Sequence, residues 1–297
     1  MKKNIANLLI VVLMAMLLGA CGEKAQVDTA ESVGQVMFKG SSTLAPVVTT
    51  ITKEYMEANG TWDKVNEDFP KEEIDIAIGG GGSGAGIKAL LDKSANFGMV
   101  SRNVSEDEKK SIEGYKEYKL GTDALTISVN PSNKIYEIKD GLSTEELKKI
   151  FSGEYTHWNQ VDSRLSNEEI VLVTRDVGGG AHKVFKKKIM GDVKVSDNVI
   201  QSPSMGALVN KIIENKNAIG YASFGVVNQN KDKIIPLNVD GVSPSVENIK
   251  DGKYKISRPL LVIKSGELNP YEKAIIDKLL SEDGLKVVEQ LGFVPQK

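Results

Sequence analysis

The chain has 297 residues, of which 40% are hydrophobic and 26% are charged, and its formal net charge is −2. This length and apolar content are enough for two ordinary domains or one large one. The nearly balanced charge argues against a nucleic-acid partner, and it means that any anion must be caught by local geometry and not by a broad positive field.

The N-terminal segment predicts export and anchoring. Two lysines precede the apolar run 8–18, which is too short to span a membrane comfortably. The run ends in Leu-Gly-Ala-Cys at Cys21, the only cysteine of the chain, and this tetrapeptide resembles the bacterial lipobox. We expect residues 1–20 to be a lipoprotein signal peptide, Cys21 to carry the lipid, and the polar residues 21–34 to form a tether. An ordinary signal peptide followed by a chance cysteine is the alternative.

Apolar periodicity predicts that strands alternate with helices along the rest of the chain, which indicates an α/β fold. The expected strands are 35–39, 74–78, 97–100, 124–130, 170–174, 217–222 and 259–263. Three expected helices have both ends defined by the pattern, at 44–59, 270–280 and 283–291. Two more follow glycine segments and include residues 87–91 and 184–189, and two others are expected to begin near residues 105 and 142.

Three segments rich in glycine or hydroxyl residues each stand between a predicted strand and a predicted helix. They are residues 40–43, 79–86 and 175–181. A helix N-terminus presents unpaired N–H groups and a partial positive charge, and ligands of open α/β sheets bind where a strand passes to a helix. We therefore expect the three segments to share one site for a small oxyanion, held mainly by neutral donors.

The glycine cluster 79–86 allows other interpretations. It satisfies the dinucleotide pattern G-x-G-x-x-G, although such cofactors are intracellular, and it is also compatible with a flexible turn. Ser83 is a conceivable nucleophile, but Ala85 stands where a G-x-S-x-G elbow needs glycine. With only two histidines in the chain, neither a catalytic base nor a metal site is indicated.

Arg175 follows a predicted buried strand and begins the third segment. A buried charge is costly unless it is paired. Arg175 is therefore either part of a structural salt bridge with Asp176 or Asp123, or a clamp that donates two hydrogen bonds to an oxyanion. We favour the clamp. Arg102, which comes shortly after the strand 97–100, has the same two interpretations.

Taken together, these segments resemble the phosphate-binding lipoproteins of bacterial high-affinity phosphate ABC transporters. The resemblance runs from about Val36 to Pro295, nearly the whole chain after the tether. The stretches that carry it are 40–46 (Gly-Ser-Ser-Thr-Leu-Ala-Pro), 82–88 (Gly-Ser-Gly-Ala-Gly-Ile-Lys), 97–102, 142–153 with Trp158, 218–221, 257–260 and 291–295.

The resemblance implies a two-lobed periplasmic-binding-protein fold of the α/β class (type II-like), with two crossover strands and the ligand in the cleft between the lobes. We place the crossovers near residues 122–124 and 236–241, where the apolar pattern pauses. Lobe 1 then comprises residues 35–122 plus 237–297, and lobe 2 comprises residues 123–236.

The resemblance also implies a set of phosphate-binding residues, carried over position by position. They are Ser42 (hydroxyl), Thr43 (backbone N–H), Ser83, Arg102, Arg175, Gly179, Gly180 and Ala181.

The chain departs from the family pattern at two places. Family members usually have Gly-Ser-Gly-Thr after the arginine segment, whereas residues 178–181 here are Gly-Gly-Gly-Ala, which removes two hydroxyl donors. Some members have aspartate at the position of Arg102, where it accepts the phosphate proton. Here Asp123 is the first candidate for that acceptor and Asp176 the second.

The expected protein is a receptor and not an enzyme, and we expect no cofactor and no metal. Its expected partners are inorganic phosphate, the subunits of an ABC permease and, through the lipid, the cell membrane; we expect a monomer outside the cytoplasm. A receptor for sulfate, molybdate or tungstate is the alternative in the same class. An exported hydrolase or phosphatase using Ser83 is the alternative in another class.

The lipid anchor generates the first prediction. The substitution Cys21→Ser should move the protein from the membrane fraction to the soluble fraction, because the acylated side chain is lost. Fractionation of cells without detergent measures this. A variant that stays fully membrane-bound would contradict the anchor.

Overall fold

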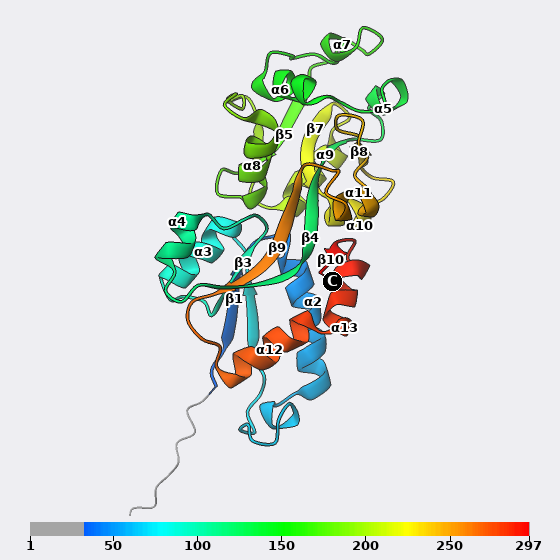
Figure 1. Cartoon of the computed structure of the whole chain (residues 1–297). Helices are drawn as coiled ribbons and strands as arrows, with labels where there is room; N and C mark the ends of the chain where they lie inside the picture. The colour runs from blue at the N-terminus through cyan, green and yellow to red at the C-terminus, as the bar shows by residue number, and fades with distance from the viewer. Residues whose placement is uncertain (1–32, 297) are drawn as a thin grey trace, which may run out of the picture. The chain divides into compact units, whose positions relative to one another are not determined.

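The computed structural model describes residues 33–296, which form a mixed α/β fold with two lobes (Figure 1). The expected signal peptide, Cys21 and most of the expected tether lie outside the described residues. Within residues 33–296, no helix combines the length and the hydropathy that a membrane span requires.

The strands join into one hydrogen-bonded sheet in the order β2-β1-β3-β9-β4-β7-β5-β6, with β8 and β10 also paired to β4. The strands are β1 (Val36–Gly40), β2 (Ile76–Gly79), β3 (Phe97–Val100), β4 (Lys116–Val129), β5 (Val171–Arg175), β6 (Ile200–Ser202), β7 (Ala218–Ser223), β8 (Ile235–Leu237), β9 (Ser257–Lys264) and β10 (Val294–Pro295). In lobe 1, β1 runs parallel to β2 and β3, and in lobe 2, β5 runs parallel to β6 and β7.

The helices cover the sheet of each lobe, and several begin at side-chain caps that the sequence provides. Ser105 with Glu108, and Ser143 with Glu146, form capping boxes at the starts of two helices. The helices are α2 (Ala45–Asn59), α3 (Ser83–Leu91), α4 (Glu106–Ser111), α5 (Ile135–Ile138), α6 (Thr144–Ser152), α7 (Trp158–Val161), α8 (Gly180–Phe185), α9 (Met205–Glu214), α10 (Phe224–Gln229), α11 (Val246–Lys250), α12 (Pro270–Leu280) and α13 (Glu282–Gln290). A 3₁₀ turn η1 (Trp62–Lys64) and a π-helical turn η2 (Lys186–Met190) complete the set for the described residues.

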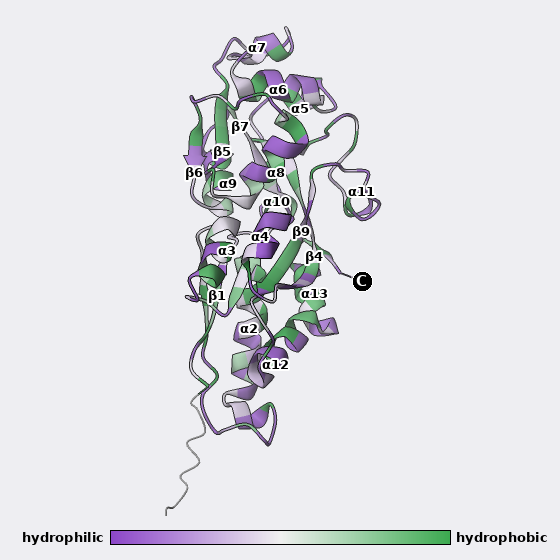
Figure 2. Cartoon of the chain, turned by 60° about the vertical axis from the view of Figure 1, so that its left-hand side comes forward, coloured by the Kyte–Doolittle hydropathy of each residue, from purple (hydrophilic) through white to green (hydrophobic). Residues whose placement is uncertain are grey.

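Each lobe has its own large hydrophobic core. In lobe 1, Phe38 of β1 stacks on Phe97 of β3 with ring centroids 4.6 Å apart. In lobe 2, Phe185 stacks on Tyr221 at 4.3 Å and meets Phe151 of α6 at 4.7 Å. Figure 2 shows the apolar residues gathered along the strands, β4 and β9 among them, while the helices carry both colours. Two separate cores of this kind are what a two-lobed protein requires.

Strand β4 belongs to both lobes. It is 14 residues long, and its residues 116–124 pair with β9, whereas residues 125–129 pair with β7. Strand β9 also crosses, because it starts with Ser257 opposite Ala124 and continues beside β3 in lobe 1. The predicted α/β class and two-lobed fold are therefore confirmed.

Long-range contacts favour a second crossover later in the chain than the one that the sequence predicts near 236–241. Strand β8 still pairs with the lobe 2 end of β4, and Tyr254 and Ile256 are buried in the lobe 2 core. The pause in the apolar pattern at 236–241 marks a turn inside lobe 2, where Asp240 and Gly241 both have positive φ. We therefore propose that lobe 2 spans about residues 124–256 and that the rest of the described chain forms lobe 1.

Helix α3 lies directly on β1 and β3 because Gly86 has no side chain. A Cβ atom at this position would lie 2.7 Å from the carbonyl oxygen of Lys39 and 2.9 Å from that of Met99. Both atoms belong to the backbone of a strand, so neither can move aside cheaply.

This contact generates the second prediction. The substitution Gly86→Ala should lower the free energy of unfolding by about 1–3 kcal/mol, because α3 must move away from the sheet. Gly206→Ala in α9 is the matched control, since nothing lies within 4 Å of a Cβ there. The control should be neutral or stabilising by up to about 1 kcal/mol. Urea unfolding measures both; equal effects would contradict the close contact.

Candidate functional site

The strand ends of lobe 1 are tied together by short hydrogen bonds. The N–H group of Gly82 donates to the carbonyl oxygen of Gly40 at 2.8 Å, which joins the segments after β2 and β1. The N–H group of Ser101, just after β3, donates to Oγ of Ser83 at 3.1 Å. The three parallel strands of this lobe therefore end at one place, as expected for a ligand site in an α/β sheet.

Arg175 reaches from lobe 2 to lobe 1. It is the last residue of β5 and only 2% exposed. Its Nη1 donates to Oγ of Ser42 at 3.2 Å, and its Nη2 donates to Asp176 Oδ1 at 2.9 Å and to the carbonyl of Pro203 at 3.1 Å. Its Nε donates to the carbonyl of Ser202 at 3.0 Å. The guanidinium thus points at the first hydroxyl segment, and its hydrogen bonds to Asp176, Ser202 and Pro203 of its own lobe fix its orientation.

Glycines allow the backbones of the two lobes to touch. A Cβ atom on Gly180 would lie 2.4 Å from Oγ of Ser83. Cβ atoms on Gly82 or Gly84 would each lie 3.3 Å from the carbonyl oxygen of Gly178. The structure therefore brings all three sequence segments together where lobe 1 meets lobe 2, and Gly179, Gly180 and Ala181 start α8 at this place.

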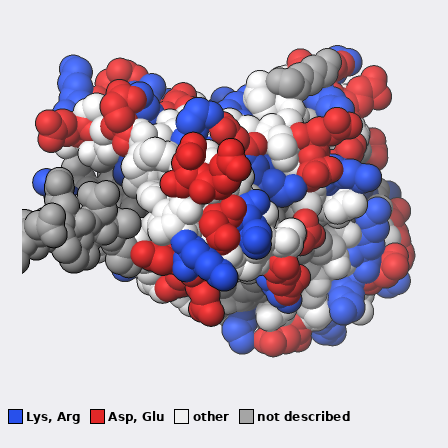
Figure 3. Space-filling view, turned by 90° about the horizontal axis from the view of Figure 1, so that it is seen from below, with Lys and Arg blue, Asp and Glu red and all other residues white. Residues whose placement is uncertain are grey.

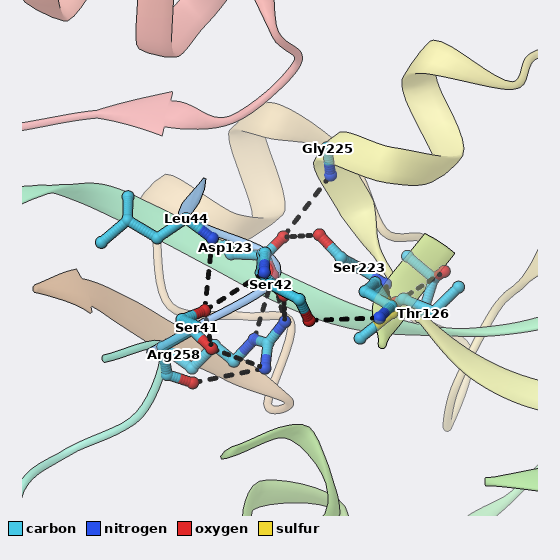
Figure 4. A network of polar contacts seen from close by, with 12 residues as sticks. Ser41, Ser42, Leu44, Asp123, Thr126, Ser223, Gly225 and Arg258 are labelled. Carbon is cyan, nitrogen blue, oxygen red and sulfur yellow. Dashed lines mark hydrogen bonds and ion pairs between the residues drawn. The ribbon is translucent and has the colours of Figure 1, made fainter. Parts of the chain in front are cut away.

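A buried network that sequence reasoning missed lies at the centre of this region. Arg258 of β9 donates from Nε and Nη2 to Oδ2 of Asp123 in β4, at 2.9 and 2.7 Å, with both side chains essentially unexposed (Figure 4). Burial lowers the pKa of Arg258 and the charge of Asp123 opposes this shift. The sequence did contain a signal for Arg258, the same one that identified Arg175: a charged residue at the edge of a predicted buried apolar strand.

Arg102 is held by a carboxylate of its own lobe. Its Nη1 and Nη2 donate to Glu108 Oε2 and Oε1 at 2.7 and 2.8 Å. Burial would raise the pKa of Glu108, but hydrogen bonds from Arg102 and Ser105 outweigh it and bring the pKa to about 2. The expected anion contacts of Arg102 and Asp123 thus stay predictions. Glu108 occupies both terminal nitrogens of Arg102, whereas Nε of Arg102 is buried without a hydrogen-bond partner.

A cavity of about 440 Å³ is lined by residues of both lobes and by Arg258. Arg102 and Glu108 line it from lobe 1, and Lys183, Lys187 and Lys188 line it from lobe 2. Nζ of Lys183 lies 3.9 Å from Glu108, the one ion pair across this cavity among the described residues. Basic side chains thus gather locally on its lobe 2 wall. On the face drawn in Figure 3, by contrast, acidic and basic residues are intermixed.

Tyr221 and His182 support the arginine and do not form a catalytic pair with Ser83. The hydroxyl of Tyr221 accepts the N–H of Arg175 at 3.0 Å and lies 3.3 Å from Nδ1 of His182. Burial raises the pKa of Tyr221 and lowers that of His182, so both are neutral at neutral pH. Within residues 33–296, no group of three His, Cys, Asp or Glu side chains could hold a metal ion.

Known proteins are similar to this chain in both sequence and fold. A family profile described as a PBP superfamily domain matches residues 25–282. The phosphate-binding protein PstS of Staphylococcus saprophyticus is 31% identical, over 94% of this chain and 86% of its own length. The chain belongs to the PstS family of the PBP superfamily.

Solved structures agree with this membership. A putative phosphate ABC transporter substrate-binding protein with bound phosphate, from Clostridium perfringens, is 28% identical and covers 89% of this chain and 100% of its own, with a TM-score of 0.76. PstS from Borrelia burgdorferi is 26% identical, covers 89% and 99% of the two chains, and has a TM-score of 0.57. The family resemblance inferred from the sequence is confirmed, and PstS relatives are transport receptors, not enzymes.

The ion pair of Arg102 generates the third prediction. The pKa of Glu108 is lowered on folding, so its contribution to stability is complete above pH 4.5 and is lost as the pH falls toward 2. Between pH 5 and 3 the wild type should lose about 1 kcal/mol more unfolding free energy than Glu108→Gln, since the pair is partly exposed. Glu106→Gln, on the same helix but in an exposed pair, is the control. Identical pH profiles for all three proteins would contradict the assignment.

Proposed function

We propose that this chain is an extracytoplasmic solute-binding lipoprotein that captures inorganic phosphate and delivers it to an ABC transporter permease. Phosphate would be bound and released without any bond being made or broken. The observation that carries the proposal is the meeting of three glycine- and hydroxyl-rich strand ends around Arg175, whose Nη1 lies 3.2 Å from Oγ of Ser42 in the other lobe. The PstS relatives and the phosphate-bound structure from Clostridium perfringens support it.

The proposed ligands are neutral donors arranged around one cation. Lobe 1 offers the hydroxyls of Ser42 and Ser83 and the N–H of Thr43, which in this structure donates to Oγ of Ser41 at 3.2 Å. Lobe 2 offers the guanidinium of Arg175. The N–H groups of Gly180 and Ala181 complete the set, together with that of Gly179, which in this structure donates to the carbonyl oxygen of Asp176 at 2.9 Å. Donors that belong to two lobes hold an anion fully only when the lobes are closed, so phosphate stabilises the closed form by its differential affinity.

The proton of phosphate needs an acceptor if the site is to reject sulfate, because a donor-only site treats the two anions alike. Asp123 is fully buried, and both of its carboxylate oxygens accept hydrogen bonds, from Ser223 and from Arg258. The side chain of Asp176 is 38% exposed, and its Oδ1 accepts from Arg175. We propose Asp176 as the acceptor, and we assign Asp123 and Arg102 supporting positions beside the site.

The test of the function is calorimetric titration of the mature protein with phosphate, sulfate, arsenate and molybdate. Tight binding of phosphate with weak binding of sulfate supports the proposal. Stronger binding of sulfate or molybdate would make the chain a receptor for that oxyanion, since the same donors fit it. Turnover of a chromogenic phosphate ester would favour the hydrolase alternative with Ser83, which lacks a histidine partner in the described hydrogen bonds.

The anchoring part of the proposal concerns the segment before the described fold. Residues 1–20 would be removed on export, Cys21 would carry the lipid, and residues 21–34 would let the folded part reach the permease from the membrane surface. We propose that the folded part works as a monomer, because all the proposed ligands come from the two lobes of one chain.

Arg175 generates the fourth prediction. The substitution Arg175→Ala should weaken phosphate binding at least about tenfold, because a charge-assisted hydrogen bond contributes about 1.5–3 kcal/mol. The fold should be retained, as checked by circular dichroism, with affinity measured by calorimetry. Arg164→Ala is the matched control: it removes an exposed arginine of lobe 2 that pairs with Asp162. Unchanged affinity in Arg175→Ala would reduce Arg175 to a structural role.

A further inference from the structure

Arg258 and Asp123 lie opposite each other on the two strands that cross between the lobes. Their side chains are 1% and 0% exposed, and Arg258 places two nitrogen atoms on one carboxylate oxygen of Asp123. A guanidinium has five N–H donors in a rigid plane, so this pair leaves donors free for other acceptors.

The remaining donors of Arg258 reach two of the loops that form the proposed anion site. Nη2 donates to Oγ1 of Thr43 at 3.0 Å, and Nη1 donates to Ser101 at 3.2 Å to Oγ and 3.3 Å to the carbonyl oxygen. Ser101 in turn accepts from Ser41 at 2.9 Å and donates its N–H to Ser83 at 3.1 Å. One side chain therefore holds the first loop directly and the second loop through Ser101.

The other oxygen of Asp123 extends the same network into lobe 2. Oδ1 accepts from the hydroxyl of Ser223 at 3.0 Å and faces the N–H of Gly225 at 3.5 Å (Figure 4). Ser223 ends β7 and Gly225 lies in α10, so both belong to the second lobe. The ion pair is thus bonded to both lobes at the point where the crossover strands meet.

We propose that Arg258 is a positioning residue of the anion site. It fixes Thr43 and Ser101, and through Ser101 it fixes Ser83, so that their donors face the anion that Arg175 binds. Arg258 does not contact the anion, because its charge is compensated by Asp123 and its donors are engaged by the loops. Asp123 orients Arg258 and links it to Ser223. This proposal rests on the proposed function.

A structural salt bridge with no influence on the site is the competing explanation. The same strand provides a matched control, because Lys264 at the end of β9 forms a buried pair with Glu272 at 2.8 Å. The side chain of Glu272 accepts from Lys264, Asn96 and Asn269, none of which belongs to the anion loops. Removing this second pair therefore changes stability without touching the site.

The experiment compares Arg258→Lys, Thr43→Val, Thr43→Ser and Lys264→Met with the wild type. For each protein, the unfolding temperature is measured by calorimetry, and the affinities for phosphate and sulfate are measured by titration well below that temperature. Lysine keeps the charge but cannot reach Asp123, Thr43 and Ser101 at once. Thr43→Val removes only the acceptor for Arg258, and Thr43→Ser keeps it.

We expect Arg258→Lys to weaken phosphate binding at least about tenfold and Thr43→Val at least about threefold. Thr43→Ser, which keeps the acceptor for Arg258, should bind phosphate more tightly than Thr43→Val. Lys264→Met should lose stability but keep the wild-type affinity. Wild-type affinity in both Arg258→Lys and Thr43→Val would overturn the proposal, and if Arg258→Lys does not fold, the two Thr43 variants decide. If the wild type binds sulfate and not phosphate, the proposed function fails, and the same comparison is made with sulfate.

Discussion

The close approach of the two lobes at glycine is the constraint on which the site depends. Gly82 and Gly84 meet the carbonyl of Gly178, and Gly180 leaves no room for a Cβ atom beside Ser83. A Cβ atom at Gly180 would lie 2.4 Å from Oγ of Ser83, and at Gly82 or Gly84 it would lie 3.3 Å from the carbonyl oxygen of Gly178, so a larger residue at any of these three positions would require the facing lobe to shift. The approach of the two lobes therefore favours glycine, and it also leaves backbone N–H groups exposed at the site.

Electrostatics around the site follow one rule, in which each buried arginine has a carboxylate of its own. The pairs are Arg102–Glu108, Arg175–Asp176 and Arg258–Asp123. The pairs differ in how many terminal guanidinium nitrogens the carboxylate binds. Asp176 accepts from one terminal nitrogen of Arg175, whereas Glu108 accepts from both terminal nitrogens of Arg102. Arg175 is thus the arginine whose donors face the opposite lobe, which explains why one cation among three carries the proposed binding.

Local sequence patterns predicted most of the strands and helices. The features that they did not predict depend on contacts between residues far apart in the chain. Strand β3 and helix α12 have the expected bounds, because apolar runs and a proline at the helix start mark them in the sequence. The convergence of the three segments followed from the rule that ligands bind at strand ends. The partner of Arg258 could not be identified, because Asp123 is 135 residues away and no local pattern reports that contact. The later crossover that we propose also rests on a long-range contact, since the turn at Gly241 looks like a boundary until β8 is seen beside β4.

The composition of the lobe 1 core has a consequence for the order of events during secretion. This core combines residues from the start of the chain, such as Phe38, with residues near its end, such as Ile275 and Phe293. Lobe 2, apart from Val294, draws its core from a single uninterrupted stretch. A chain that emerges from its N-terminus can therefore complete lobe 2 first, while lobe 1 waits for the last residues to cross. The lobe that holds both ends of the described chain is then the last to fold.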